Sequence, residues 1–311
     1  MDLYLNESRG RLHFKDLLGQ ANHLIVTALV GLDAVEKGLV TGPPPELHAA
    51  WSPKNPINSA RRARRLILDM VLVRAVDSVD IYIRKARKLP GLVQSTVLRH
   101  SIDGAGRSVM RKVSALEEQY GTVEPVVFAL VLVMIAWRNK SAHEEADTKV
   151  DDRYREILLK NAPAIATEYR GLEVDRLLSG FDSGDPTFKE CASLISATQR
   201  FVQTLETLLF RDIDAEQYLR ELVWKTPSEL SSDDAVSFRK QRIKSVWGRD
   251  AADRRRAVVR HLRQYGITDT RRHDGAIFPS ALIDYICELS PSEVYAWAEP
   301  SPQTFSVEDT R

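Results

Sequence analysis

An unbroken apolar run of eleven residues, VVFALVLVMIA from Val126 to Ala136, is the feature that most constrains how this chain folds. A helix that is apolar on every side has to be buried, because no face of it tolerates water. A membrane span needs about 20 such residues, so the run is too short to cross a bilayer. It therefore predicts a helix at the centre of a folded core.

Most of the remaining sequence has the spacing of amphipathic helices, and strand signals are scarce. The second predicted helix shows the spacing most clearly, because apolar residues recur every three or four positions along it. These residues are Leu68, Leu72, Val76, Val79 and Ile83. We expect helices at about 12–38, 59–88, 92–120 with a break near 103–106, 125–140, 150–161, 163–179, 186–211, 214–224, 233–247, 250–265, 279–288 and 291–298. The predicted fold class is all-α.

The composition of the sequence changes near residue 226, which suggests two domains in the 311 residues. The stretch TPSELSSDDAV (Thr226 to Val236) is polar and rich in residues that cap helices. We expect an elaborated helical bundle over 1–225 and a smaller helical C-terminal module over 226–311, whose role is open.

Composition limits the functions that such a chain can have. Lys plus Arg is 44 and Asp plus Glu is 43, so nucleic acid would have to bind at a local basic patch. The only two cysteines, Cys191 and Cys287, lie far apart and form no metal-binding spacing. The N-terminus lacks the pattern of a signal peptide. These features predict a cytoplasmic protein without a membrane anchor, a disulfide framework or a zinc site.

An arginine and a histidine follow the apolar run, in the sequence WRNKSAHEEAD. Five positions of ideal helix leave Arg138 and His143 roughly 140° apart, so on a straight helix they would not face one spot. Asn139 and Ser141 compete for backbone hydrogen bonds and are poor residues for a helix interior. The two side chains can converge if the helix ends within the motif, or if two chains bring two motifs together.

Arginine and histidine together suit the cleavage of RNA. A histidine titrates near neutral pH and can take a proton from a 2′-hydroxyl or give one to a leaving oxygen. A guanidinium binds phosphate in two-pronged fashion and stabilises the charge that builds on it. This chemistry needs no metal or cofactor, and the sequence shows no cluster of metal ligands.

The segment from about 125 to 146 resembles the HEPN superfamily of ribonucleases. The signature of that family is an arginine, a polar residue that is often asparagine, three further residues and a histidine, here Arg138-Asn139-Lys140-Ser141-Ala142-His143. The resemblance implies a helical bundle that forms a homodimer, with two motifs facing one composite cleft. It also implies metal-independent endoribonuclease activity that leaves a 2′,3′-cyclic phosphate, with Arg138 and His143 as the catalytic pair and Asn139 in support.

The same resemblance implies a setting for this activity in toxin–antitoxin, abortive-infection or RNA-targeting CRISPR defence. RNA would be the substrate, and an antitoxin, a phage-derived trigger or a nucleotide could regulate the enzyme. The sequence does not say which RNA is cut.

Further charged residues are candidates for supporting roles. Members of the family often carry an acidic residue on an earlier helix, which favours Asp77 as a group that orients the motif. Lys140 could contact phosphate. The densest basic run could hold an RNA backbone, and it consists of Arg61, Arg62, Arg64 and Arg65. For each of these, the alternative is an ordinary solvated helix face.

Two other classes of function stay open. The chain could be a non-catalytic helical scaffold or a regulatory, nucleotide-binding subunit, in which the motif only packs an interface. It could also be a repressor that reads DNA with the basic amphipathic helix near 253–267, whose apolar side carries Val258, Val259, Leu262 and Tyr265. The near-neutral net charge weakens the second idea.

Overall fold

The computed structural model describes residues 1–40, 42–43, 46, 48, 50–51, 53–121, 124–142, 149–227, 230–272 and 274–300. Within these residues the chain is essentially all-α, as predicted, with one small sheet of three strands. The elements are β1 (Leu3–Leu5), α1 (Arg9–Glu36), α2 (Pro56–Arg87), α3 (Thr96–Gly104), α4 (Val109–Tyr120), α5 (Pro125–Ala142), α6 (Asp152–Lys160), α7 (Ala162–Glu168), α8 (Val174–Ser183), α9 (Phe188–Arg211), α10 (Ala215–Trp224), α11 (Ser232–Trp247), α12 (Ala251–Arg263), β2 (Ile267–Thr268), β3 (Ala276–Phe278), α13 (Ser280–Glu288) and α14 (Pro291–Ala298).

The residues group into two compact units. Unit 1 comprises Met1–Leu12, Tyr82–Gly104 and Thr204–Arg311, and unit 2 comprises His13–Ile81 and Ala105–Gln203. The long helices α1, α2 and α9 each contribute residues to both units. The predicted domains 1–225 and 226–311 follow the order of the chain, whereas these units do not, and that division stays a prediction.

The apolar helix α5 forms the centre of unit 2, as its sequence predicted. Every side chain from Val127 to Trp137 is exposed by 4% or less. The Phe128 ring lies 5.6 Å from that of Tyr154 on α6 and 6.3 Å from that of Phe201 on α9, measured between ring centroids. Neighbours on several sides explain why α5 carries no polar face.

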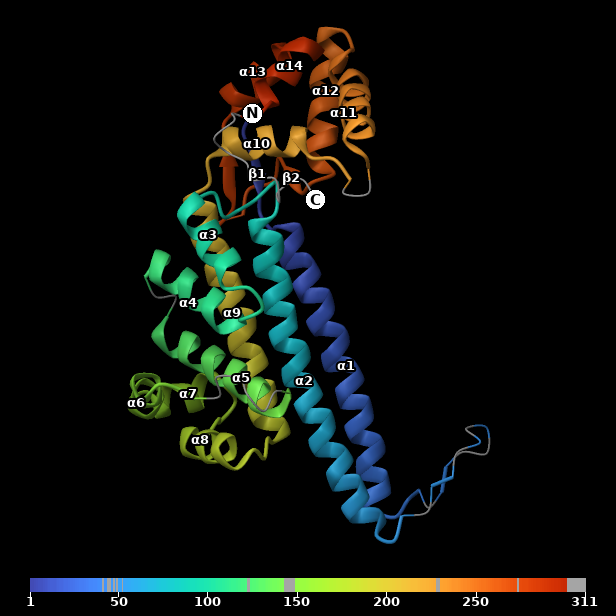
Figure 1. Cartoon of the computed structure of the whole chain (residues 1–311), viewed down its shortest axis with the longest axis vertical. Helices are drawn as coiled ribbons and strands as arrows, with labels where there is room; N and C mark the ends of the chain where they lie inside the picture. The colour runs from blue at the N-terminus through green and yellow to red at the C-terminus, as the bar shows by residue number, and fades with distance from the viewer. Residues whose placement is uncertain are drawn as a thin grey trace. The chain divides into compact units, whose positions relative to one another are not determined.

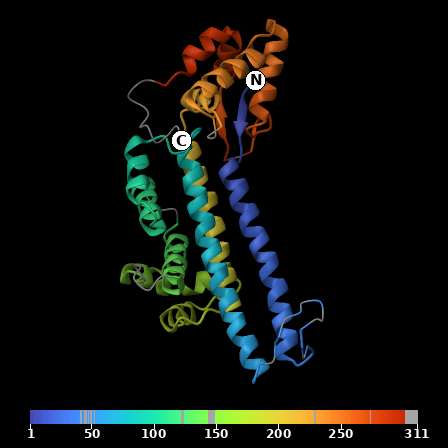
Figure 2. The same cartoon turned by 45° about the vertical axis from the view of Figure 1, so that its right-hand side comes forward.

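The predicted core stripe of α2 is also confirmed. Its members are exposed by 2% or less, and they are Leu68, Leu72, Val76, Val79 and Ile83. Within unit 2, α1 and α2 run alongside each other in opposite directions (Figures 1 and 2). α1 buries its own stripe of Phe14, Leu18, Ile25 and Leu29.

One predicted helix, 163–179, is wrong and is two helices in the structure, α7 and α8. The break lies at Arg170 and Gly171, which have φ angles of 55° and 78°. The Gly171 N–H donates to the Ala166 carbonyl at 2.6 Å, which closes the end of α7. A glycine just past a helix end adopts this left-handed conformation without steric cost, so Gly171 was the available signal.

The sheet of unit 1 was not predicted. β1 is its central strand and pairs antiparallel with β2 and β3, placing Leu5 opposite Ile267 and Ala276. Strands of two or three residues are too short for an alternating pattern to stand out. They form because pairing partners far apart in the sequence bury Leu5 completely.

A buried carboxylate holds the start of α1 in unit 1. Glu206 is fully buried and accepts hydrogen bonds from the Ser8 N–H at 3.2 Å and from the Ser8 hydroxyl at 2.5 Å. Its burial raises the pKa of this carboxyl. The contact satisfies an N–H at the beginning of α1 that would otherwise have no acceptor.

α1 has the length and apolar composition of a helix that could cross a membrane. The relevant 18-residue stretch is only 19% buried. Large apolar side chains of α1 that are exposed include Leu24 at 67% and Val30 at 65%. This exposure sets α1 apart from α5, which is the more apolar of the two helices and is buried from Val127 to Trp137.

Candidate functional site at the end of α5

The buried part of α5 fixes the position of its last turn. The Trp137 ring packs edge-on against Phe181 of α8, with ring centroids 5.8 Å apart. Gly180 of α8 lies beside this ring, and a Cβ atom there would be 3.4 Å from it, an ordinary van der Waals contact. The next four residues, Arg138 to Ser141, therefore emerge from the core at a defined place in unit 2.

Arg138 is half-buried, and its Nε atom is buried without a hydrogen-bond acceptor among the described residues. No ion pair joins its guanidinium to any carboxylate in the part of the chain that the structure describes. The neighbouring Asn139 is half-buried. His143, the other half of the predicted catalytic pair, lies outside the described residues.

Lys140 has an internal role that the sequence did not suggest. Its ammonium donates to the carbonyl oxygens of Phe181 at 3.0 Å and Asp182 at 2.6 Å, at the C-terminal end of α8. A cation is favourable there, because the last carbonyls of a helix lack partners and carry partial negative charge. Arg155 of α6 donates hydrogen bonds to the Asp182 carboxylate, and this hydrogen bonding holds the pKa of Asp182 below its usual value.

Ser141 links the motif to α2. Its hydroxyl donates to Oδ1 of Asp69 at 2.9 Å. The family resemblance had favoured Asp77 as the acidic partner on this helix. Asp69 is also an acidic residue of α2 and lies beside the core residue Leu68, as Asp77 lies beside Val76, so the sequence pattern alone could not choose between them.

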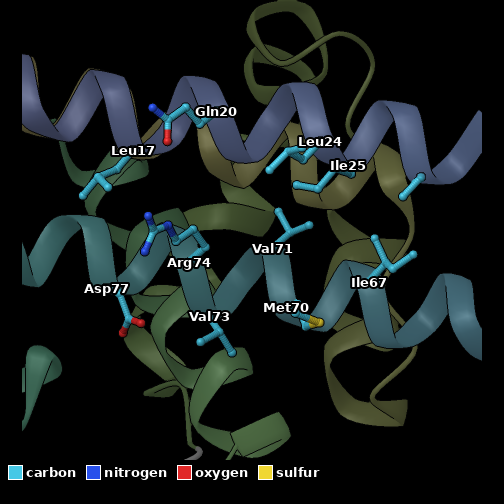
Figure 3. Close-up of a pocket in the computed structure, with 11 residues that line it drawn as sticks. Leu17, Gln20, Leu24, Ile25, Ile67, Met70, Val71, Val73, Arg74 and Asp77 are labelled. Atoms are coloured by element: carbon cyan, nitrogen blue, oxygen red, sulfur yellow. The ribbon is translucent and has the colours of Figure 1, made fainter.

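Asp77 has a different setting. It is exposed and makes no hydrogen bond or ion pair with any described residue of the motif. It lies at one end of a groove of about 550 Å³ between α1 and α2 (Figure 3). The carboxylate that contacts the motif is that of Asp69, eight residues or about 12 Å earlier on α2.

The basic run at the start of α2 divides into two pairs. Arg61 and Arg64 both bind Glu36 of α1, at 3.0 and 3.3 Å, and the hydrogen bond from Arg61 lowers the pKa of Glu36. Arg62 and Arg65 have no carboxylate partner among the described residues.

Arg65 is the member of this run that the structure brings toward the motif. Its guanidinium would lie 3.4 Å from a Cβ atom at Gly184, and the Lys140 side chain would lie 4.0 Å from the same point. Both side chains therefore border the end of α8. This makes Arg65 the nearest described cation of the run to the end of α5.

The basic helix of unit 1 has most of its arginines engaged within the fold. Arg255 pairs with Asp284, Arg263 pairs with Asp269 at 2.6 Å, and Arg254 donates to the carbonyls at the end of α13. On the apolar side Val258 and Leu262 are buried, as predicted, whereas Val259 and Tyr265 are half-buried.

No group of three or more His, Cys, Asp and Glu side chains is arranged to hold a metal ion within the described part of the chain. Cys191 is buried in the core of unit 2, where burial raises the pKa of its thiol, and Cys287 is half-buried. Comparisons with protein-family models, with curated proteins and with solved structures find no match to this chain.

Proposed function

We propose that this protein is a cytoplasmic, metal-independent endoribonuclease of the HEPN type that acts as a toxin or antiviral effector. Arg138 and His143 are its catalytic pair, and Asn139 supports them. Two chains contribute one motif each to a composite site. The identity of the trigger, whether antitoxin, phage product or nucleotide, is left open by this proposal.

The observation that carries the proposal is the state of Arg138. A guanidinium whose Nε is buried without an acceptor loses hydration without gaining a partner. An anionic ligand removes that cost, and the fork of a guanidinium matches two oxygens of a phosphate. Arg65, which also has no described carboxylate partner, can extend the same attraction along an RNA backbone.

The proposed reaction is an internal transesterification. A base removes the proton from the ribose 2′-hydroxyl, whose oxygen attacks the adjacent phosphorus, and the bond to the 5′-oxygen breaks as that oxygen takes up a proton. The products are a 2′,3′-cyclic phosphate and a 5′-hydroxyl end. His143 moves the proton, and Arg138 binds the non-bridging oxygens as their charge increases.

A second candidate is the non-catalytic scaffold or regulatory subunit. It is favoured by internal contacts of the motif, including those of Lys140 to the end of α8 and of Ser141 to Asp69. Such contacts are what a packing motif requires.

The test compares wild type with His143→Ala and Arg138→Ala on mixed RNA in excess EDTA, with analysis of the product ends. His100→Ala is a matched control, because His100 is an exposed histidine outside the motif. We expect cyclic-phosphate ends from wild type and the control, and a loss of about 10²-fold or more in each motif variant. Equal cleavage by all four proteins would contradict the proposal. A folded wild-type protein that cuts no RNA, and whose expression is not toxic to the cell, would also contradict it.

A further inference from the structure

α2 carries a second stripe of residues, which is largely exposed, in contrast to the buried stripe described above. Arg62, Leu66, Met70, Val73 and Asp77 follow one another at spacings of three or four residues, which places them on one side of the helix. Leu66 and Met70 are each 61% exposed, and the two charged ends are exposed as well. Large apolar side chains in this setting mark an interaction surface.

The groove between α1 and α2 borders this stripe and extends the apolar surface onto α1 (Figure 3). Its lining is mainly aliphatic and includes Leu17, Leu24, Ile25, Ile67, Met70 and Val71. Together the two helices present an apolar face about as long as the stripe, which spans the sixteen residues from Arg62 to Asp77, or about 22 Å.

The stripe has a symmetric order of residue types. Arg62 and Asp77 are equally distant from the point between residues 69 and 70, and so are Leu66 and Val73. Neither charged residue has an ion pair with a described residue. If an identical stripe is laid antiparallel on this one, each Arg62 meets an Asp77 and each Leu66 meets a Val73, while Met70 lies beside the centre, opposite Asp69.

We propose that this face binds a second copy of the chain, with the two α2 helices antiparallel across a two-fold axis beside Asp69 and Met70. A two-fold interface uses the same patch on both subunits, so a self-complementary stripe is what it requires. The α1 helices flank the pair, which gives a four-helix arrangement with apolar side chains between the helices.

The position of the two-fold axis determines where the two motifs lie in the dimer, and this step rests on the proposed function. Asp69 lies level with the centre of the stripe along α2 and accepts the hydrogen bond from Ser141. Two-fold symmetry beside Asp69 therefore brings the ends of both α5 helices to the same side of the dimer. Each end carries an Arg138, so the partner copy supplies the second motif of the composite site.

The charges at the two ends favour a second copy over other occupants. An antiparallel copy pairs both Arg62 and Asp77, whereas a flat anionic lipid surface would repel Asp77 and leave it desolvated. A partner that carries charge of a single sign can form an ion pair with only one of Arg62 and Asp77. Of these occupants, only a second copy pairs both charged ends of the stripe.

The experiment is a charge exchange followed by sedimentation equilibrium of the full chain. Arg62→Asp and Asp77→Arg each place like charges opposite one another twice in the dimer, and the double variant restores opposite charges. We expect each single variant to raise the dissociation constant about tenfold or more, and the double variant to return it close to the wild-type value.

A second pair of variants tests the apolar part of the stripe. Leu66→Glu should give monomers with unchanged circular dichroism. Leu159→Glu is the matched control, since Leu159 is a 46% exposed leucine on α6, and it should leave the dimer intact.

Three outcomes would overturn the docking surface. These are a wild type that stays monomeric at every concentration, a dimer that Leu66→Glu does not weaken, and single charge variants that the double variant does not rescue. A monomer that sediments with phosphatidylglycerol vesicles would instead assign the apolar face of α1 to lipid. Because sedimentation needs no RNA, a dimer that follows the charge exchange but cuts no RNA would overturn only the proposed function.

Discussion

The Ser141 hydroxyl donates a 2.9 Å hydrogen bond to Oδ1 of Asp69, which ties the last turn of α5 to the middle of α2. This bond joins the two parts of the molecule that matter most for its proposed function. One is the turn that carries Arg138, and the other is the exposed stripe to which a second copy is proposed to bind.

Removing the Asp69 carboxylate should reduce RNA cleavage through the position of the motif. We expect Asp69→Ala and Ser141→Ala each to lower kcat about tenfold with little change in KM, because a misplaced catalytic group slows the reaction without weakening binding. Asp69→Asn keeps an acceptor and should retain most activity. The check is steady-state kinetics, with Glu156→Ala as an exposed carboxylate control.

The double variant of Asp69 and Ser141 makes this prediction sharper. Two residues that act through one hydrogen bond should show no further loss when both are changed. Losses that multiply would mean that the two side chains act separately.

Lys140→Ala should destabilise the fold rather than abolish chemistry. The substitution removes the ammonium that donates to the Phe181 and Asp182 carbonyls, which costs about 1 kcal/mol, and the Phe181 carbonyl keeps its bond from the Gly184 N–H at 3.2 Å. Lys140→Arg keeps a cation at the end of α8 and should recover part of the loss. Urea denaturation measures the change. Unaltered stability together with weaker RNA binding would instead support the original hypothesis of a phosphate contact.

Glu36→Gln should strengthen RNA binding. The change releases Arg61 and Arg64 from their shared carboxylate, so that both can join Arg65 in contacting phosphate. The slope of log affinity against log salt should steepen by up to about two, because each new phosphate contact releases about one counterion. Asp33→Asn is the control, since Asp33 pairs only with Lys37 among the described residues. An unchanged slope would remove the basic run from the RNA surface.

His261 should make the stability of the protein fall in mild acid. Burial, with a smaller effect of Arg242, lowers the pKa of this histidine to about 4, and its Nε2 has no acceptor among the described residues. Between pH 6.5 and 4 the unfolded chain binds a proton that the folded protein does not, so the free energy of unfolding decreases as the pH falls. The loss approaches about 3 kcal/mol at the lower end, and the full stability is present above pH 6.5.

The variant His261→Phe removes this group and isolates its effect. It keeps a ring between Trp247 and Tyr265, whose centroids lie 6.1 and 5.3 Å from that of His261. Denaturation at pH 7.5, 6 and 5 should show a shallower pH dependence than wild type. Parallel curves for the two proteins would mean that His261 does not titrate in this range.

Much of the fold was predictable from local patterns. The apolar run defined α5, and the spacing of Leu68, Leu72 and Val76 defined the buried side of α2, because a helix repeats every 3.6 residues and needs no distant information. The break between α3 and α4 near 103–106 was marked by glycines in the same local way.

The contacts within the candidate site could be predicted less well from the sequence. The motif residues could be named from their order, but the choice of Asp77 over Asp69 depended on which turn of α2 meets the end of α5. Lys140 was a candidate for a phosphate contact, with a solvated helix face as the alternative, and its contact with α8 depends on a helix that begins more than thirty residues later. Such contacts join residues that no local pattern relates.

The sequence by itself determined the helical class, the central place of α5 and the presence of an arginine–histidine motif at its end, because hydrophobic periodicity and residue order are local properties. Only the tertiary structure decided that Asp69 contacts Ser141, that Glu36 binds half of the basic run, and that Leu66 and Met70 of α2 are exposed. These facts depend on which helices pack together. Packing follows from the complementarity of whole surfaces, which no single segment encodes.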